Sequence, residues 1–401
     1  MKFSSRQLIL AVGAGTAVLL AGLGMTGRAA AQTAPKAAPA ASKGPTYSGV
    51  ANSRTPAGMY FKAVNTSTLK VLSVDDFLQA MGVMAAGLGF DCSDCHPGAG
   101  SDKVDWVFDT PKKKMARMMT EMVAIINKNN FGNQQKVTCW TCHHGREVPT
   151  TSITLDHLYA APYDEKDDVI LPGKDVPTPA QTLDKYIAAV GGASKLAGLK
   201  TFVATGGATG YEKLGGGGTF EIFGQAPDKH TVSITFKDHP ERGDSVRAYD
   251  GKQGWIRTPR GLFTDYELVG TELNGARVDA LLAFPGQIKT VLQNMKSGFT
   301  DTIDDKAVEV VQGTAAGNEL VTLYFDQKSG LLVRTVRFGN TPIGHSPVQT
   351  DYSDYRDVGG IKFPFKYTFS WLDGRDSFTL SSVKVNVPVD AAKFGNPAAK
   401  K

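Results

Sequence analysis

The sequence predicts an α+β fold, with a helical N-terminal part and a β-rich C-terminal part. Between Ser73 and Arg146, apolar side chains recur at helical spacing around two copies of the pentapeptide Cys-x-x-Cys-His. From Thr201 onward, short strand-like runs alternate with turn sequences. We therefore expect a helical domain at residues 46–150 and a curved antiparallel sheet with a packed helix at 178–395. A linker at 151–177 is expected between them.

The N-terminus has the features of a secretory signal peptide covering residues 1–31. Lys2 and Arg6 form a basic start, an apolar stretch covers residues 8–25, and cleavage is expected after Ala31. An uncleaved membrane anchor is the alternative, because the apolar run is about long enough to cross a bilayer. Cleavage predicts a protein exported to the periplasm.

The mature chain is expected to be nearly neutral. Loss of Lys2, Arg6 and Arg28 lowers the formal net charge from +5 to +2, which implies neither nucleic acid nor an anionic membrane as a partner. Residues 32–45 contain no large apolar side chain and predict a flexible tether. No cysteine precedes Cys92, so a lipid anchor at the amino end is not expected.

Two helices are predicted beside the pentapeptides. Ser73 has the character of an N-cap for a helix that ends near Gly89 and carries one apolar face, formed by Phe77, Met81, Met84 and Leu88. Thr110 caps a second helix with Pro111 at its first position. That helix is rich in methionine and is followed by a polar, loop-like stretch at residues 127–135.

The pentapeptides at residues 92–96 and 139–143 use all four cysteines of the chain. Cys-x-x-Cys-His is the attachment site for c-type haem: the two thiols bind one porphyrin and the histidine is the proximal iron ligand. A zinc site and a thioredoxin-like dithiol are the alternatives. A zinc ribbon does not need a histidine directly after each cysteine pair, whereas here both pairs have one. A thioredoxin-like motif needs a βαβ frame, whereas the sequence around these motifs predicts helices. The sequence therefore predicts two haem c groups.

Seven of the ten methionines lie between Met59 and Met122, close to the pentapeptides. A methionine thioether is a common sixth ligand of haem iron. A methionine stripe on a helix is also typical of core packing, and spacing alone does not choose between the two roles.

Residues 81–149 resemble half of the tetrahaem cytochrome subunit of bacterial photosynthetic reaction centres. The similarity lies in residues 88–92, 116–122 and 137–143, and in the pair Gly145-Arg146. Family members bind each of three haem irons with a methionine from the helix that precedes the haem motif.

The resemblance implies Met81 as the sixth ligand of the first haem, 15 residues before His96. It implies Met119 for the second haem, 24 residues before His143. The chain departs from the family in having two haem motifs rather than four, and the family's loop histidine is replaced near Asn133. Photosynthesis itself is therefore not implied.

The complete predicted site combines attachment residues and iron ligands. The haem-binding residues are Cys92, Cys95, His96, Cys139, Cys142, His143 and Arg146, and the iron ligands are His96, Met81, His143 and Met119. Arg146 is expected to pair with a haem propionate, with a solvated role as the alternative. His144 is expected to be a solvated neighbour, and Lys112–Lys114 a solvated helix start that could also steer an acidic partner.

The C-terminal part is predicted to be a series of hairpins that one helix, at residues 276–295, interrupts. The expected strands are residues 219–223, 230–236, 246–249, 254–257, 320–325, 332–338, 366–372 and 377–387. This order resembles the bacterial lipoprotein-carrier (LolA-like) half-barrel family. The similarity rests on residues 249–251 before Trp255, on 324–326 before 330–332, and on residues 355–364. Members of that family bind lipoproteins or lipids, so a hydrophobic ligand is one expectation and a self-filled hollow is the other.

The expected function is electron transfer in the periplasm to or from a redox protein, without catalysis. Association with a membrane complex stays open. The alternatives are a dihaem peroxidase or dehydrogenase, which needs a displaceable sixth ligand, and a lipid- or quinone-binding protein with haem-based redox function.

Overall fold

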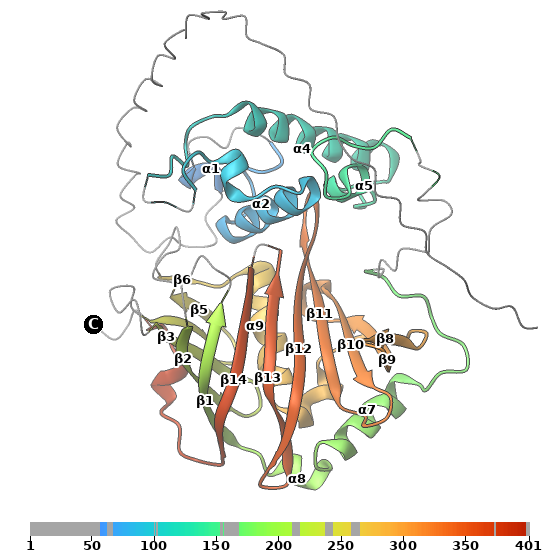
Figure 1. Ribbon diagram of the computed structural model, residues 1–401, viewed down its shortest axis with the longest axis vertical. Helices are drawn as coiled ribbons and strands as arrows, with labels where there is room; N and C mark the ends of the chain where they lie inside the picture. Colours follow the sequence, from blue (N-terminus) through green and yellow to red (C-terminus); the bar gives the residue numbers. More distant parts are fainter. Residues whose placement is uncertain are drawn as a thin grey trace, which may run out of the picture. The chain divides into compact units, whose positions relative to one another are not determined.

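The computed structural model describes most of the chain (Figure 1). The described residues are 57–61, 67–99, 101, 103–152, 155, 168–210, 217–236, 244–257, 265–372 and 374–397. The predicted signal peptide and tether lie outside them.

The part of the chain around the pentapeptides contains five helices among its described residues. Its helices are α1 (Ala57–Tyr60), α2 (Val74–Leu88), α3 (Cys92–Cys95), α4 (Pro111–Asn130) and α5 (Cys139–His143). The Ser73 hydroxyl accepts the Asp76 amide at 3.1 Å, and the Thr110 hydroxyl accepts the Lys113 amide at 3.2 Å, so both predicted N-caps are confirmed. Among the described helices, none combines the length and the hydrophobicity that a membrane span requires.

Helix α4 continues to Asn130, so the polar stretch predicted as a loop from residue 127 begins later than expected. Asn127 explains the difference, because its side-chain amide is buried and forms hydrogen bonds with the segment that follows the helix. Its Nδ2 donates to the Val137 carbonyl at 2.7 Å, and its Oδ1 accepts the amides of Lys136 at 3.0 Å and Val137 at 2.9 Å. One polar side chain inside the helix thus holds the segment that leads into α5.

The C-terminal part is a large antiparallel sheet. Its strands are β1 (Thr201–Gly210), β2 (Gly217–Gln225), β3 (Lys229–Phe236), β4 (Ser245–Tyr249), β5 (Gly254–Arg257), β6 (Asp265–Glu267), β7 (Gln293–Ser297), β8 (Asp301–Ile303), β9 (Lys306–Thr314), β10 (Leu320–Asp326), β11 (Leu332–Thr341), β12 (Gly344–Val358), β13 (Ile361–Trp371) and β14 (Gly374–Val385). Strands β1 to β6 form one meander and β9 to β14 another, and β1 pairs with β14 to join them. All strand pairings of the described residues are antiparallel, so no βαβ frame surrounds either pentapeptide.

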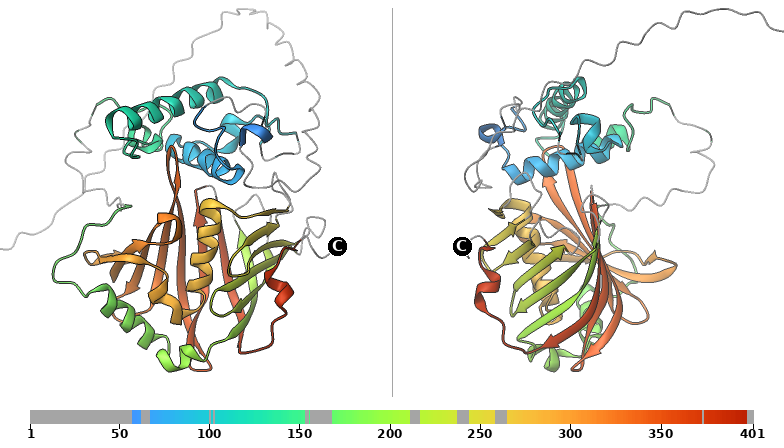
Figure 2. Two further views of the ribbon diagram at one scale, coloured as in Figure 1. Left: turned by 180° about the vertical axis from the view of Figure 1, so that it is seen from behind. Right: turned by 60° about the vertical axis from the view of Figure 1, so that its left-hand side comes forward.

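The sheet curves around helix α9 (Gly270–Leu282), which contacts β3, β4 and β11. Five strands separate β3 from β11 in the sheet, a distance of roughly 29 Å if the sheet were flat. A helix is only about 10–12 Å wide, so it reaches both strands because the sheet wraps around it. Figure 2 shows α9 against the inner face, and the prediction of a helix on the concave side is confirmed.

The predicted bounds of this helix, residues 276–295, are wrong at both ends. Helix α9 begins at Gly270 and stops at Leu282, and Pro285 then opens a short 3-10 helix, η3 (Pro285–Thr290). Proline lacks an amide hydrogen and disfavours a helical residue before it, which accounts for the break.

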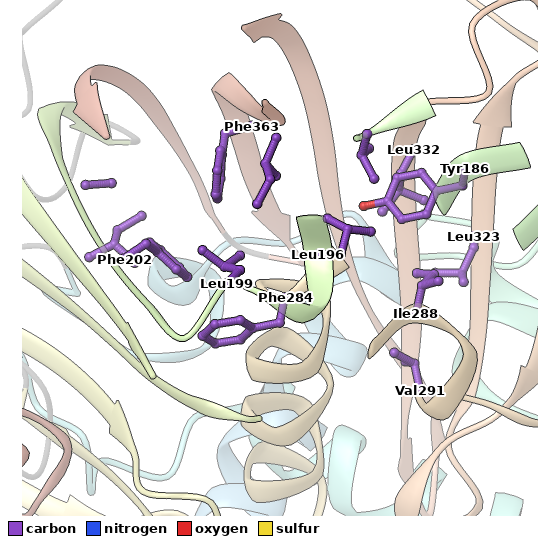
Figure 3. Close-up of a cluster of buried hydrophobic side chains, with 14 of the residues drawn as sticks. Tyr186, Leu196, Leu199, Phe202, Phe284, Ile288, Val291, Leu323, Leu332 and Phe363 are labelled. Atoms are coloured by element: carbon purple, nitrogen blue, oxygen red, sulfur yellow. The ribbon is translucent and has the colours of Figure 1, made fainter. Parts of the chain in front are cut away.

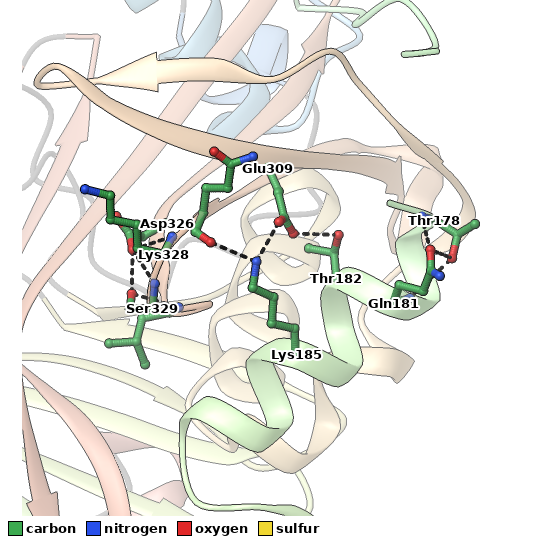
Figure 4. A network of polar contacts seen from close by, with 10 residues as sticks. Thr178, Gln181, Thr182, Lys185, Glu309, Asp326, Lys328 and Ser329 are labelled. Carbon is green, nitrogen blue, oxygen red and sulfur yellow. Dashed lines mark hydrogen bonds and ion pairs between the residues drawn. The ribbon is translucent and has the colours of Figure 1, made fainter. Parts of the chain in front are cut away.

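The main core lies between the sheet and two helices, α7 (Pro179–Ala189) and α8 (Ala193–Ala197). These helices lie at the end of the sheet that is far from α2 (Figure 1). Figure 3 shows residues of this core from all these elements: Tyr186, Leu196, Leu199, Phe202, Phe284, Ile288, Val291, Leu323, Leu332 and Phe363. Polar contacts fasten α7 to strand β9 (Figure 4). Buried Glu309 accepts from the Thr182 hydroxyl at 3.0 Å and from Lys185 Nζ at 2.7 Å.

A second, smaller apolar cluster joins the helical part to the sheet. Ala80 and Val83 of α2 pack with Ile343, which lies in the tight turn between β11 and β12. The Cys139 amide donates to the Ile343 carbonyl at 3.1 Å, and Gln135 Nε2 donates to the Thr341 carbonyl. The β11–β12 turn therefore directly supports the second pentapeptide.

Candidate functional site

Each pentapeptide forms one turn of helix. Helix α3 holds Cys92 and Cys95, with His96 as its C-cap, and α5 spans Cys139 to His143. Residues at positions i, i+3 and i+4 of a helical turn lie on one side of it. In the second motif, where His143 belongs to α5, the two thiols and the imidazole therefore share a side, which attachment of one porphyrin requires. In the first motif the two thiols share a side and His96 follows directly as the C-cap.

Side chains cap both turns. The Asp91 carboxylate accepts the Ser93 amide at 2.6 Å, and Asp94 accepts the Asp91 amide at 2.9 Å. In the second motif, the Thr138 and Thr141 hydroxyls each accept the other residue's amide, at 3.3 and 3.0 Å. Two capping boxes thus stabilise the helical turn of each motif.

The imidazole of His143 is oriented by the backbone. Its Nδ1 lies 2.9 Å from the Arg146 carbonyl oxygen. Since a carbonyl oxygen can only accept a hydrogen bond, Nδ1 carries the hydrogen and donates it. This bond fixes the tautomer in which Nε2 carries the free electron pair, the form that binds a metal ion.

His96 is held against Trp106 instead, by ring packing and by a hydrogen bond with the Trp106 backbone. Its ring lies edge-on to Trp106, with centroids 5.0 Å apart, and its Nδ1 is buried without a hydrogen-bond partner among the described residues. Burial lowers the pKa of His96 to about 4, and the charge of Lys113 acts in the same direction. The imidazole is therefore neutral at pH 7, as an iron ligand must be.

The four cysteines are free thiols. Burial raises the pKa of Cys139 to about 11 and also raises the pKa of Cys95. Throughout the described part of the chain, no three His, Cys, Asp or Glu side chains converge as a metal site.

The second motif packs on the C-terminal end of α2. The Gly145 amide donates to the Gly87 carbonyl at 3.0 Å, and a methyl group built on Gly87 would lie 2.9 Å from the Cβ of Cys139. Helix α2 therefore contacts one motif directly and leads into the other.

Lys112 links the two motifs. Its Nζ lies 3.3 Å from Asp94 in the first motif and 3.6 Å from Glu147, just after the second, and 3.9 Å from the centre of the Phe90 ring. From the sequence, Lys112 is expected to be part of a solvated helix start. Its two ion pairs join segments that are far apart in the chain, so no local sequence pattern indicates them.

The two methionines implied as ligands lie on separate helices and are half-buried: Met81 on α2 and Met119 on α4. Met84 packs against the cluster around Ile343 instead. Met118 is 56% exposed and points away from the packed side of α4. Arg146 is exposed beside the second motif.

Large apolar side chains are exposed around the motifs. They are Trp106, Val107, Phe108, Met115, Met118, Met122, Ile125 and Trp140, each at least 41% exposed. This is much more apolar surface than one short segment of a soluble protein normally exposes, and a haem is a large flat apolar body. Together with the thiol pairs and the histidine that follows each pair, these residues fit two haem c groups.

Residues 16–168 match the family model of the photosynthetic reaction centre cytochrome c subunit. The match includes both pentapeptides, Met81 and Met119. The resemblance predicted from the sequence is thus confirmed for this part of the chain. No curated protein sequence matches the chain.

The C-terminal half is similar to solved structures of low sequence identity. A LolA superfamily protein from Nitrosomonas europaea is 12% identical with a TM-score of 0.38, and the match covers 56% of this chain and 100% of that one. A DUF1329 family protein from Desulfovibrio piger is 10% identical with a TM-score of 0.38, covering 55% and 98%. Lipoprotein LppX from Mycobacterium tuberculosis is 18% identical with a TM-score of 0.20, covering 53% and 99%.

Proposed function

We propose that this chain is an exported electron-transfer protein that carries two covalently bound c-type haems. The observation that carries the proposal is the pair of capped helical turns, each of which holds two thiols with a histidine directly after them. The family match over residues 16–168 supports it. Bound haem iron would supply a one-electron redox centre at each motif.

In this proposal Cys92 and Cys95 attach the first haem, and Cys139 and Cys142 the second. His96 and His143 are the proximal ligands, and Met81 and Met119 complete the coordination. Arg146 pairs with a propionate of the second haem, because its guanidinium is exposed next to α5.

The proposal includes a short path between the haems. Lys112 joins Asp94 of the first motif to Glu147 behind the second, which supports haems that lie close together. Export by the predicted signal peptide would place both motifs in the periplasm, where c-type haem is attached and a redox protein partner is expected.

The test is the intact mass and the visible spectrum of the exported protein. We expect two haem additions, and one addition in each of the double variants Cys92→Ala/Cys95→Ala and Cys139→Ala/Cys142→Ala. Fewer than two additions in the natural protein would overturn the dihaem assignment. A high-spin spectrum in the oxidised protein would favour an enzyme with an open iron position over a pure electron carrier.

A further inference from the structure

The second motif is tied to a part of the sheet, the β11–β12 turn at residues 341–344. Strands β11 and β12 reach the helical part at this turn (Figure 1). The Ile343 carbonyl accepts the Cys139 amide at 3.1 Å, and Gln135 Nε2 donates to another carbonyl of the turn. The β domain therefore bonds both to the first residue of α5 and to the segment that leads into it.

The turn has a fixed shape and a close fit. The Thr341 hydroxyl donates to the Gly344 carbonyl at 2.6 Å, which closes the turn. A methyl group built on Gly344 would lie 2.7 Å from a methyl carbon of Val83 in α2, and 3.6 Å from the Cβ of Thr138, the N-cap of α5. The turn thus fits closely against both α2 and the start of the second motif.

The side chain of Ile343 packs beside an attachment cysteine. It is 0% exposed and forms a cluster with Ala80 and Val83, and Cys139 itself packs against this cluster. Cys139 is one of the two points at which the second porphyrin would be bonded, so this packing also lies beside the haem. The apolar shell around a haem controls access of water and is one of the main determinants of its reduction potential.

The first motif is held differently. The Thr110 hydroxyl donates to the Cys95 carbonyl at 3.3 Å, and the Trp106 ring packs against His96. Both contacts come from the loop between the first motif and α4, within the helical part. The β domain thus supports the second motif through direct contacts of a kind that differs from the support of the first.

Helix α2, which carries Met81, has other ties to the β domain besides the turn. Gln79 Nε2 donates to Glu272 of α9 at 3.3 Å, and Val74 packs with Tyr266 of β6. A change confined to the turn should therefore disturb the second motif more than it disturbs Met81.

We propose that the β11–β12 turn forms one wall of the second haem site and raises the reduction potential of that haem, so that the β domain tunes one of the two haems. The inference rests on the proposed function, because it needs haem at both motifs. Ile343 and Gln135 are positioning residues: Ile343 keeps water from the Cys139 side of the site, and Gln135 holds the segment before it. Exclusion of water disfavours the oxidised haem, which carries one more positive charge than the reduced haem, and so raises the potential.

Redox titration of the haem-loaded full chain, followed by visible spectra, tests the proposal. The single-haem variants Cys92→Ala/Cys95→Ala and Cys139→Ala/Cys142→Ala assign each potential to its motif. We expect Ile343→Ala to lower the equilibrium constant for reduction of the second haem at least tenfold, which is about 59 mV for one electron. The same constant for the first haem should change less than about threefold, because the first motif is held within the helical part.

The matched control is Ile288→Ala, because Ile288 is 1% exposed but lies in the main core. It should leave both potentials unchanged although it also removes buried side-chain volume. Ile343→Val should recover at least half of the shift, since most of the side chain is kept. If Ile343→Ala shifts neither potential, shifts both equally, or is matched by Ile288→Ala, the turn is not a wall of the second haem site.

Gln135→Ala decides the question if Ile343→Ala does not fold. It should lower the same constant for the second haem at least about threefold, since the site loosens and admits water. Gln134→Ala, at an exposed neighbouring position, is its control and should have no effect. An unchanged potential in Gln135→Ala would then overturn the inference. Failure of the proposed function looks different, because the single-haem variants would carry no haem by intact mass.

Discussion

At the scale of single residues, the proposed iron ligands Met81 and Met119 lie only three positions or one position from Met84 and Met118. The family resemblance implies the first pair, both half-buried, whereas Met84 packs against the Ile343 cluster and Met118 is 56% exposed. We expect Met81→Ala and Met119→Ala each to convert about half of the haem to a high-spin form and to lower the potential of that haem, because the thioether is lost. Visible spectra and redox titration measure both effects.

The matched controls for this prediction are Met84→Ala and Met118→Ala. Both should leave the haems low-spin, and Met84→Ala should instead reduce stability by about 2–4 kcal/mol through the cavity it leaves. If a control variant turns one haem high-spin, the residue replaced in that variant is the ligand, and the assignment implied by the family resemblance is wrong.

Glu319 makes a pH-dependent prediction at the same scale. Burial raises the pKa of its carboxyl from the ordinary 4.5 to about 7, and its Oε2 has no partner among the described residues. The folded protein therefore holds this proton more tightly than the unfolded chain does. Its contribution to stability falls as the pH rises from about 4.5 to 7.

Glu319→Gln keeps the shape of the side chain and removes the titration. We expect the variant to be more stable than the natural protein by about 1–3 kcal/mol at pH 8, and equally stable at pH 4.5. Urea denaturation followed by circular dichroism at both values measures this difference. A variant less stable at pH 8 would show that attraction to Arg337 outweighs the cost of burial.

At the scale of elements, helix α2 is the support of the second motif. A methyl group on Gly87 would lie 2.9 Å from the Cβ of Cys139, closer than packed carbon atoms approach. Gly87→Ala should therefore displace α5, lower the stability by about 1–3 kcal/mol and reduce attachment of the second haem. Thermal unfolding and intact mass report the two effects.

Gly82→Ala is the control on the same helix. A methyl group there would meet Leu372 at 3.6 Å, an ordinary contact. We expect this change to be neutral or to stabilise the protein by up to about 1 kcal/mol, since alanine favours a helix more than glycine does. Equal effects of the two substitutions would mean that α2 does not position α5.

Elements with a local signal were predictable from the sequence, and those set by distant contacts were not. The caps at Ser73 and Thr110 are side chains that bind amides three residues away, so the sequence pattern contains the whole interaction. Helix α9 contains Gly270 and Gly275, which have low helix propensity, and its start was missed. Gly275 is needed because Arg337, from a distant strand, lies against it.

The same distinction holds for the candidate site. The cysteines and histidines of the candidate site are visible in two pentapeptides, because haem attachment depends on spacing within five residues. The contacts of Lys112 and the burial of Arg337 depend on how separate segments meet after the sheet has curved. No window of the sequence contains that information.

At the scale of the whole molecule, the question is whether the two predicted domains fold independently. The main core contains only residues from Leu183 to Val385, and none from the helical part. Among the described residues, contact between the parts comes from two small clusters, from the wall of a cavity that α2 and the sheet line together, and from hydrogen bonds: α2 covers Ile343 and Leu372 in one cluster, and Val74 and Leu78 pack with Tyr266 of β6 in the other. Exposing Ile343 would cost about 1.5–3 kcal/mol, a small fraction of what the main core contributes.

We therefore predict that a fragment of residues 178–401 folds without haem. Expressed in a host that lacks the haem-attachment machinery, it should be soluble, mostly β by circular dichroism, and less stable than the same region in the full chain. A fragment of residues 32–149 should fold only after haem attachment, because the apolar face of α4, from Met115 to Ile125, is otherwise exposed to water. If the C-terminal fragment is unfolded alone and folds when the haem-loaded fragment is added, the two parts share one cooperative unit, and the cluster around Ile343 contributes far more than its area implies.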